Sequence, residues 1–454
     1  MRNIYCLSIY FLFVLIFINE WIQLPEDVFV FLSSVTLMSM LISSIFMIKG
    51  FQFYVSVISL IFGHAILYYY GFGFKTWYGN LASGLSIPVL FLAIPMITLP
   101  LKYGNYFRSI EGYIKSKKAK PISIFLFLSI LHLTLTIPLN IGSIPAQQKL
   151  IEKINFPKDF LVRIYTAGYS SYMVFSPFDP VVNMVLIWTA ISYTDYFFSA
   201  LIMVIFIFTV TAIILRLDKK LKDNLANLLP DRGREGSNEM RNISHLLIHI
   251  SFMIILAVFC AEILPLSNQI YVVAVIVILY SFVWCFLIGA ARKMIGELKS
   301  YNKSLLQYKT LIPFLLSSSF FANCASNTPL KEEMGKAAIY FHDIPVYFII
   351  FFILLITSLL SLCGIHMIIT IPLFAMTIVP ADIGLSSIGF AITLLTGWYV
   401  SMSISPLVPF GVAVAEVIRI SPVQVTLRYN LIYCLIVLFF APLVITIINF
   451  ATIQ

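Results

Sequence analysis

The chain has 454 residues, of which 60% are hydrophobic and only 11% are charged. Its mean hydropathy of +0.98 lies far above that of a soluble domain, and apolar runs long enough to cross a bilayer recur from end to end. The net charge of +9 comes from basic residues in the loops between these runs, which indicates membrane topology rather than nucleic-acid binding. The sequence therefore predicts a polytopic membrane protein.

Four apolar runs open the chain. We expect spans at residues 4–22, 27–48, 52–71 and 84–100, separated by short turns. The first run lacks a small-residue cleavage site and is followed at once by another span, so we interpret it as a retained helix. Residues 101–120 then mix apolar side chains with lysines and an arginine, a pattern typical of an amphipathic helix on the cytoplasmic surface.

The rest of the chain contains two kinds of apolar run, uninterrupted ones and ones that are broken by polar residues or prolines. Complete spans are expected at 194–216, 243–264, 269–290, 310–327 and 427–450. Interrupted runs occupy 121–160, 161–193, 344–382 and 385–420. If the first and third of these are re-entrant hairpins, and the other two each cross once with a central break, every basic segment lies inside. Ordinary crossings would place at least one basic loop outside.

The interrupted runs contain a repeat. "HLTLTIPL" at 132–139 matches "HMIITIPL" at 366–373, and "GYSSYMVFSPFDP" at 168–180 matches "GWYVSMSISPLVP" at 397–409. "TLPLK" at 98–102 likewise matches "NTPLK" at 327–331. Because three matches occur in the same order over more than half of the chain, we interpret the protein as an internal duplication.

Charge predicts opposite orientations for the two copies. The segment after the first "PLK" is strongly basic, whereas the segment after the second is nearly balanced, as an outside segment can be. The predicted fold is therefore an all-α polytopic membrane protein with about eleven transmembrane helices, two re-entrant hairpins, and an inverted repeat with discontinuous helices. Residues 1–26 form an extra span, 27–216 the first repeat, 217–242 a cytoplasmic linker and 243–450 the second repeat. The arms are 101–120 and 328–343.

The proline pairs explain the breaks. Pro177 and Pro180 remove two amide donors and free carbonyls of the preceding turn, and Pro406 and Pro409 do the same in the second copy. Non-helical backbone survives at membrane depth only where it is buried or faces a water-filled cavity. Freed carbonyls suit a cation, and the N-terminal amides of the following half-helices suit an anion.

Polar residues at the hairpin tips, and serines next to the helix breaks, complete the predicted site. Pro138 and Pro372 are expected to interrupt the hairpin helices near tips at 138–143 and 372–377. Hydroxyl and amide groups there can bind a polar solute or an ion without the desolvation cost of full charges. The predicted substrate- or ion-binding residues are Thr136, Asn140, Ser143, Ser171, Ser176, Asp179, Asn183, Thr370, Thr377, Ser403 and Ser405.

Four titratable residues are candidates for proton coupling. Asp179 is an acid at membrane depth, which is costly and usually functional, although it could also cap the following half-helix. His132 and His366 are matched between the copies and suit either proton relays or structural hydrogen bonds. Glu416 follows the second break, or forms an interfacial pair with Arg419.

The architecture resembles the ion-transporter superfamily, which includes divalent-anion/sodium symporters and arsenite and sodium/proton antiporters. The resemblance covers nearly the whole chain: spans, an arm after "PLK", a hairpin, a broken helix ending in a proline pair, a closing span, and the same series inverted. Dicarboxylate members carry Ser-Asn-Thr at each hairpin tip. This chain has "PLNIGS" and "PLFAMT" there, and its own Ser326-Asn327-Thr328 precedes the second arm.

These features predict an H⁺- or Na⁺-coupled secondary transporter of a small polar or anionic solute, with elevator-like alternating access. The resemblance implies a homodimer embedded in membrane lipids. We expect the cytoplasmic (inner) membrane, a cytoplasmic N-terminus, no cofactor, no metal and no nucleic-acid partner. The alternative is a multi-span enzyme acting on a lipid-linked substrate. ATP-driven transport is disfavoured because no GxxxxGK[ST] motif occurs.

Overall fold

The computed structural model describes residues 2–47, 51–104, 106, 109–110, 121–151, 154–219, 221, 224–225, 237–264, 269–309, 311–329, 333, 336, 344–365 and 367–453. Every regular element in these ranges is helical. Six helices are long and apolar enough to cross a membrane, and seven shorter helices are also apolar. The protein is therefore an all-helical, polytopic membrane protein, as the composition predicts.

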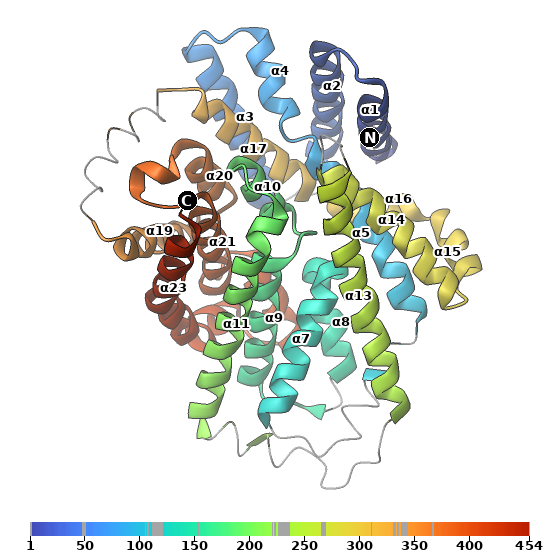
Figure 1. The fold of residues 1–454 in the computed structure, drawn as a ribbon, viewed down its shortest axis with the longest axis vertical. Coiled ribbons are helices and arrows are strands. Elements are labelled where there is room, and N and C mark those ends of the chain that lie inside the picture. The colour runs from blue at the N-terminus through green and yellow to red at the C-terminus, as the bar shows by residue number, and fades with distance from the viewer. Residues whose placement is uncertain are drawn as a thin grey trace. The chain divides into compact units, whose positions relative to one another are not determined.

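The helices divide between two compact units, which Figure 1 shows together. Unit 1 comprises Met1–Pro100, Met253–Tyr340 and Ile368–Val379. Unit 2 comprises Leu101–Phe252, Phe341–Met367 and Pro380–Gln454.

Unit 1 contains the N-terminal helices and a second group of helices around residues 269–326. They are α1 (Arg2–Ile22), α2 (Glu26–Ile45), α3 (Phe51–Tyr69), α4 (Phe74–Ala82), most of α5 (Ser86–Tyr103), α14 (Gln269–Leu287), α15 (Ala291–Leu298), α16 (Tyr301–Leu305), η3 (Leu306–Tyr308), α17 (Leu311–Ser326) and nearly all of α20 (Met367–Thr377). Helices α3 and α17 pack closely, because Gly63 leaves room for the ring of Phe320. Helix α13 (Ser237–Ile263) crosses from unit 2 into unit 1.

Unit 2 contains both broken helices. Its elements are α7 (Pro121–Leu139), η1 (Asn140–Gly142), α8 (Ser143–Ile151), α9 (Lys158–Phe175), α10 (Pro180–Trp188), α11 (Tyr193–Leu217), α19 (Val346–Leu362), η5 (Pro380–Ile383), α21 (Ser387–Ile404), α22 (Pro409–Ile418), η6 (Gln424–Tyr429) and α23 (Leu431–Thr452). In Figure 1, α7, α9 and α11 run side by side, as their contacts also show. Helices α9 and α21 pack against each other.

The two series in unit 2 have the same element order. Helix α9 ends at Phe175, and α10 begins at Pro180 after four non-helical residues; α21 ends at Ile404, and α22 begins at Pro409 after four. In both series proline is the first residue of the second half-helix, where its missing N–H has no intrahelical partner to lose. A long helix, α11 or α23, then follows each break.

Each broken helix has one glycine, at matched positions of the two series, where it packs closely against a neighbouring helix. A Cβ atom on Gly168 of α9 would lie 2.7 Å from the Cβ of His132 and 2.8 Å from backbone atoms of α7. A Cβ atom on Gly397 of α21 would lie 2.8 Å from Oγ1 of Thr357 on α19. Both contacts are tighter than a side chain allows, so each glycine permits close backbone approach.

The second hairpin turns earlier than predicted. Helix α19 ends at Leu362, and a turn follows at 363–364, so the chain turns there and not at 372–377, which lies within α20 (from Met367). Thr370, Pro372 and Thr377 therefore lie along α20. Pro372 does not break this helix, because a proline costs one backbone hydrogen bond and membrane helices accommodate that loss.

The first hairpin turns at η1, within the predicted tip, and Pro138 lies in the last turn of α7 just before it. The sequence pair 132–139 and 366–373 therefore occupies different places, the end of α7 and the start of α20. His366 and most of the predicted arms and linker lie outside the described residues.

Candidate functional site

Asp179 caps the half-helix that follows the first break. Its Oδ1 accepts hydrogen bonds from the backbone N–H groups of Val181 (2.8 Å) and Val182 (3.3 Å). The residue is only 4% exposed. A buried carboxylate at a helix N-terminus satisfies orphan donors and interacts favourably with the helix dipole. The capping role considered for Asp179 is therefore present, and it uses one of the two carboxylate oxygens.

The carbonyl groups within the first break are already paired. The Asn183 side-chain amide donates to the carbonyl oxygen of Pro177 (2.6 Å) and to that of Asp179 (2.9 Å). Ser176 accepts from the backbone N–H of Phe178 at 3.2 Å. These bonds satisfy polar groups within the break and hold it in one geometry.

The second break has a serine turn but no acid. Ser405 accepts from the N–H of Leu407 (3.4 Å) and donates to the carbonyl oxygen of Ser361 (2.9 Å), in the last turns of α19. Ser361 donates in return to the carbonyl oxygen of Ser401 at 3.4 Å. Val408 occupies the N-cap position of α22 and provides no side-chain acceptor. The second hairpin helix is thus bonded directly to the second break.

The first hairpin contacts both broken helices. Asn140, at the tip, adopts a left-handed conformation (φ 47°) and accepts a hydrogen bond from the Tyr169 hydroxyl of α9 at 3.0 Å. The Tyr169 ring stacks on Phe410 of α22, with centroids 5.0 Å apart. Inside the hairpin, Thr136 and Ser143 are hydrogen-bonded at 2.9 Å. Tyr169 and Phe410 were not predicted as site residues.

His132 is fully buried between α7 and α9. Its ring meets the edge of Tyr165 at a centroid distance of 5.0 Å, and Gln147 interacts with it from α8. The amide of Gln147 also donates to the carbonyl oxygen of Leu128 at 2.9 Å. His132 packs between these helices, but its two ring nitrogens are buried without a hydrogen-bond partner among the described residues, so the structure shows neither the proton relay nor the structural hydrogen bond that was considered.

Buried hydroxyls without partners remain next to both breaks. The Oγ atoms of Ser171 on α9 and Ser401 on α21, and Oγ1 of Thr396, are buried and have no hydrogen-bond partner among the described residues. Ser403 behaves differently, because its hydroxyl donates to the carbonyl oxygen of Tyr399 in its own helix. Buried polar groups usually find a partner, so these three hydroxyls are available to a polar ligand or ordered water.

The remaining predicted residues lie on α22 and α20. Glu416 is exposed on α22, so the structure does not bring it together with the buried residues of the breaks. Thr370 and Thr377 are buried on α20 in unit 1, where the Thr377 hydroxyl donates to its own helix at Leu373.

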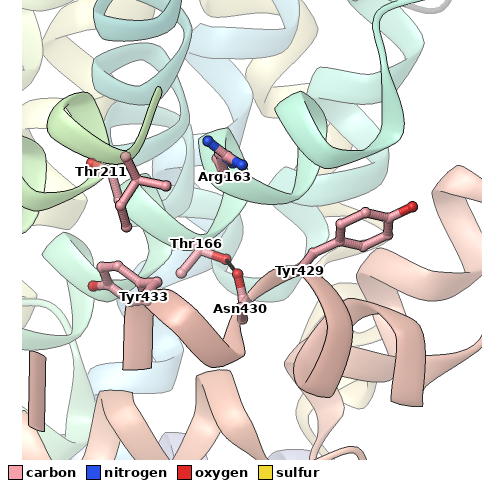
Figure 2. A pocket seen from close by; sticks show the side chains of 7 residues that line it. Arg163, Thr166, Thr211, Tyr429, Asn430 and Tyr433 are labelled. Atoms are coloured by element: carbon pink, nitrogen blue, oxygen red, sulfur yellow. Dashed lines mark hydrogen bonds between the residues drawn. The ribbon is translucent and has the colours of Figure 1, made fainter. Parts of the chain in front are cut away.

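Asn430 links the two broken helices and was missed by sequence reasoning. It follows a six-residue π-helix at the start of α23 and is 1% exposed. Its Oδ1 accepts from Thr166 of α9 at 2.9 Å, the bond drawn in Figure 2, and its amide donates to the carbonyl oxygen of Ser403 at 3.4 Å. A π-helical segment often marks a functional position, but no short sequence motif predicts one.

Comparison with known proteins identifies a shared fold. No family model matches the chain, and no curated protein matches it. Among solved structures, the chain is similar to the YdaH transporter of Alcanivorax borkumensis, whose crystal structure is described as having an unusual topology. The match has a TM-score of 0.55 and 15% sequence identity, and it covers 83% of this chain and 88% of that one. The chain therefore shares its fold with a membrane transporter.

Proposed function

We propose that the protein is an ion-gradient-coupled secondary active transporter of a small polar or anionic solute, with its binding site at the two helix breaks of unit 2. The observation that carries this proposal is that α9 and α21 pack together while each keeps a buried, unpartnered hydroxyl within five residues of its break. An ordinary helical core would pair these groups or replace them with apolar side chains.

The proposed architecture is an inverted repeat of about eleven spans and two re-entrant hairpins. Its support is the matched order of α9–α10–α11 and α21–α22–α23, the matched glycines, and the shared fold with a transporter. Discontinuous helices in inverted repeats are typical of secondary transporters. We further propose elevator-like movement, a homodimer in the cytoplasmic membrane, and an N-terminus inside.

H⁺ is the favoured coupling ion, with Na⁺ as the second candidate. Asp179 supports this choice because it is a buried carboxyl group at the first break, where its Oδ1 caps α10. The carbonyls of Pro177 and Asp179 are weaker candidates for a cation, since Asn183 already donates to both. The alternative function, an enzyme acting on a lipid-linked substrate, would not require two matched breaks.

Reconstitution tests the proposal. Purified protein in liposomes would be screened for uptake of small carboxylates, amino acids and oxyanions under a pH gradient and, separately, a Na⁺ gradient. We expect flux that depends on one gradient and is lost in Asp179→Asn.

The matched control is Asp195→Asn, because Asp195 also lies in the first turn of a helix but on the surface. An equal loss of flux in the two variants would show that the ion does not bind at Asp179 in the first break. Absence of gradient-dependent flux for every solute would contradict the transporter proposal.

A further inference from the structure

A short basic segment follows the apolar helix α14 in unit 1. Gly289 adopts a left-handed conformation (φ 71°) just after α14, and α15 begins two residues later, beside the end of α14 (Figure 1). The last turn of α14 leaves Phe286 74% exposed and Leu287 64% exposed. Large exposed apolar side chains on a membrane helix face lipid, so α15 begins where the lipid-facing surface of α14 ends.

Helix α15 has two different faces. Met294 is buried, whereas Arg292, Ile295 and Lys299 are exposed. Residues three and four positions apart share one face of a helix, so the apolar side chain of Ile295 lies between the two cations. A basic helix face that also exposes an apolar side chain is typical of a helix in a membrane interface, where the charged ends of long side chains reach the headgroups.

Hydrogen bonds from α16 hold this segment against the rest of unit 1. The Tyr301 hydroxyl donates to the carbonyl oxygen of Leu92 on α5. Asn302 accepts from the Tyr10 hydroxyl of α1 at 2.7 Å, and its backbone carbonyl accepts from the Cys6 thiol at 3.8 Å. Because Cys6 and Tyr10 lie in the first half of α1, α16 packs beside the N-terminal half of that helix.

The segment has a large excess of positive charge. Between residues 291 and 309, the only acid is Glu297, and the basic residues are Arg292, Lys293, Lys299, Lys303 and Lys309. Arg292, Lys299 and Lys303 are exposed and form no ion pair among the described residues. These three cations complement a negatively charged surface.

We propose that α15 lies in the membrane interface and binds the headgroups of anionic phospholipids through Arg292, Lys299 and Lys303, with Ile295 inserted among the upper acyl carbons. The partner is the bilayer surface, because the cations continue directly from the lipid-facing end of α14. Each Lys or Arg close to an anionic membrane surface raises affinity about fivefold. The proposal does not depend on transport activity.

Thermal unfolding of the purified full-length protein in mixed micelles tests the lipid preference. Phosphatidylglycerol would replace phosphatidylcholine stepwise at low ionic strength. We expect a saturable rise in Tm with phosphatidylglycerol that added salt weakens, because a ligand that binds only the folded state stabilises it and salt screens exposed charges. Soluble glycerophosphate should give no rise. An equal rise with glycerophosphate would show a site for free phosphate and overturn the proposal.

Paired variants separate this surface from a general charge effect. Arg292→Gln/Lys299→Gln should raise the phosphatidylglycerol concentration at the half-maximal Tm rise by about fivefold or more. The matched control is Lys75→Gln/Lys336→Gln, which removes the same charge from two exposed lysines elsewhere and should leave the titration unchanged. An equal shift in both pairs, or no preference for phosphatidylglycerol in the unmodified protein, would overturn the proposal.

A fluorescence measurement tests the depth of α15. Ile295→Cys, in a Cys363→Ser background, would be labelled with an environment-sensitive fluorophore and reconstituted in liposomes that contain phosphatidylglycerol. The same background with Ile295 retained gives the blank. We expect quenching by lipids that carry a nitroxide near the headgroup, and protection from iodide in the aqueous phase. Strong quenching by iodide without quenching by the lipids would show a water-exposed loop and contradict the proposal.

Discussion

The ring of Tyr169 stacks on the ring of Phe410, and the Tyr169 hydroxyl donates to Asn140. One side chain of the first broken helix thus contacts the half-helix after the second break and the tip of the first hairpin. Such a contact couples three elements that a transporter of this fold would have to move or hold in register.

Tyr169→Phe keeps the stacking and removes the hydrogen bond to Asn140. We expect a loss of about 1 kcal/mol in unfolding free energy, the usual net value of one hydrogen bond. Asn140→Ala should cost more, because it also places an alanine in the left-handed conformation (φ 47°). The double variant should still cost less than the sum, because both changes remove the same bond. Unfolding in detergent measures this cycle; strictly additive losses would show that the bond contributes nothing.

Asp179→Asn and Asp179→Ala separate capping from coupling. Asparagine caps helices as well as aspartate does, whereas alanine at an N-cap costs about 0.5–2 kcal/mol. We therefore expect Asn to retain most of the stability and Ala to lose it, while both abolish gradient-dependent flux. If Asp179→Asn retains full flux, the carboxylate is a cap and nothing more.

The unpartnered hydroxyls predict variants that keep their stability but lose transport. Ser171→Ala and Ser401→Ala remove buried groups that have no hydrogen-bond partner, so stability should be unchanged or slightly higher. Transport should fall if these hydroxyls bind the solute or ion. Ser403→Ala is the matched control, because that hydroxyl already bonds within its own helix, and its flux should stay near the unmodified level.

At the matched glycines, we expect the addition of a single methyl group to lower the unfolding free energy. In Gly168→Ala the new Cβ would meet backbone atoms of α7 at 2.8 Å, and we expect a loss of about 1–3 kcal/mol. Gly397→Ala should be milder, since its nearest neighbour is the Thr357 side chain. Gly79→Ala, with nothing within 4 Å in helix α4, should be neutral or stabilising. Thermal unfolding of the three variants ranks them.

Labelling of Cys363 tests from which side of the membrane the second hairpin is accessible. It is exposed at the turn after α19, and the proposed topology opens this hairpin to the outside. A membrane-impermeant maleimide should therefore label Cys363 in intact cells, and Cys363→Ser should abolish that labelling. Labelling only after permeabilisation would contradict the proposed orientation of the second repeat.

Composition and proline spacing predicted the fold class and the helix ends around both breaks, because the bilayer and the missing N–H groups constrain the backbone directly. The turn of the second hairpin was misplaced, since Pro372 is tolerated within α20 while the chain turns at 363–364, within "SLCG", whose only turn residue is Gly364.

Side-chain pairing was less predictable than the backbone. The sequence predicts Asn183 as a binding residue, and in the structure its amide donates to two carbonyl oxygens of the break, those of Pro177 and Asp179. Asn430 and Tyr169 act across helices that lie more than 200 residues apart in the chain, and no local pattern records such contacts. Polar residues at a break therefore indicate where a site lies, while tertiary packing decides which of them stay available.

One break carries Asp179 and the other carries Val408 at the same place. The two copies are alike in backbone and unlike in charge, so a substitution at one position has no equivalent at the other. Under the proposed duplication, the two halves share a backbone scaffold at the breaks and differ in the side chains that it carries. Evolutionary divergence between the halves should therefore concentrate in the few side chains at the breaks rather than in the glycines and prolines that shape them.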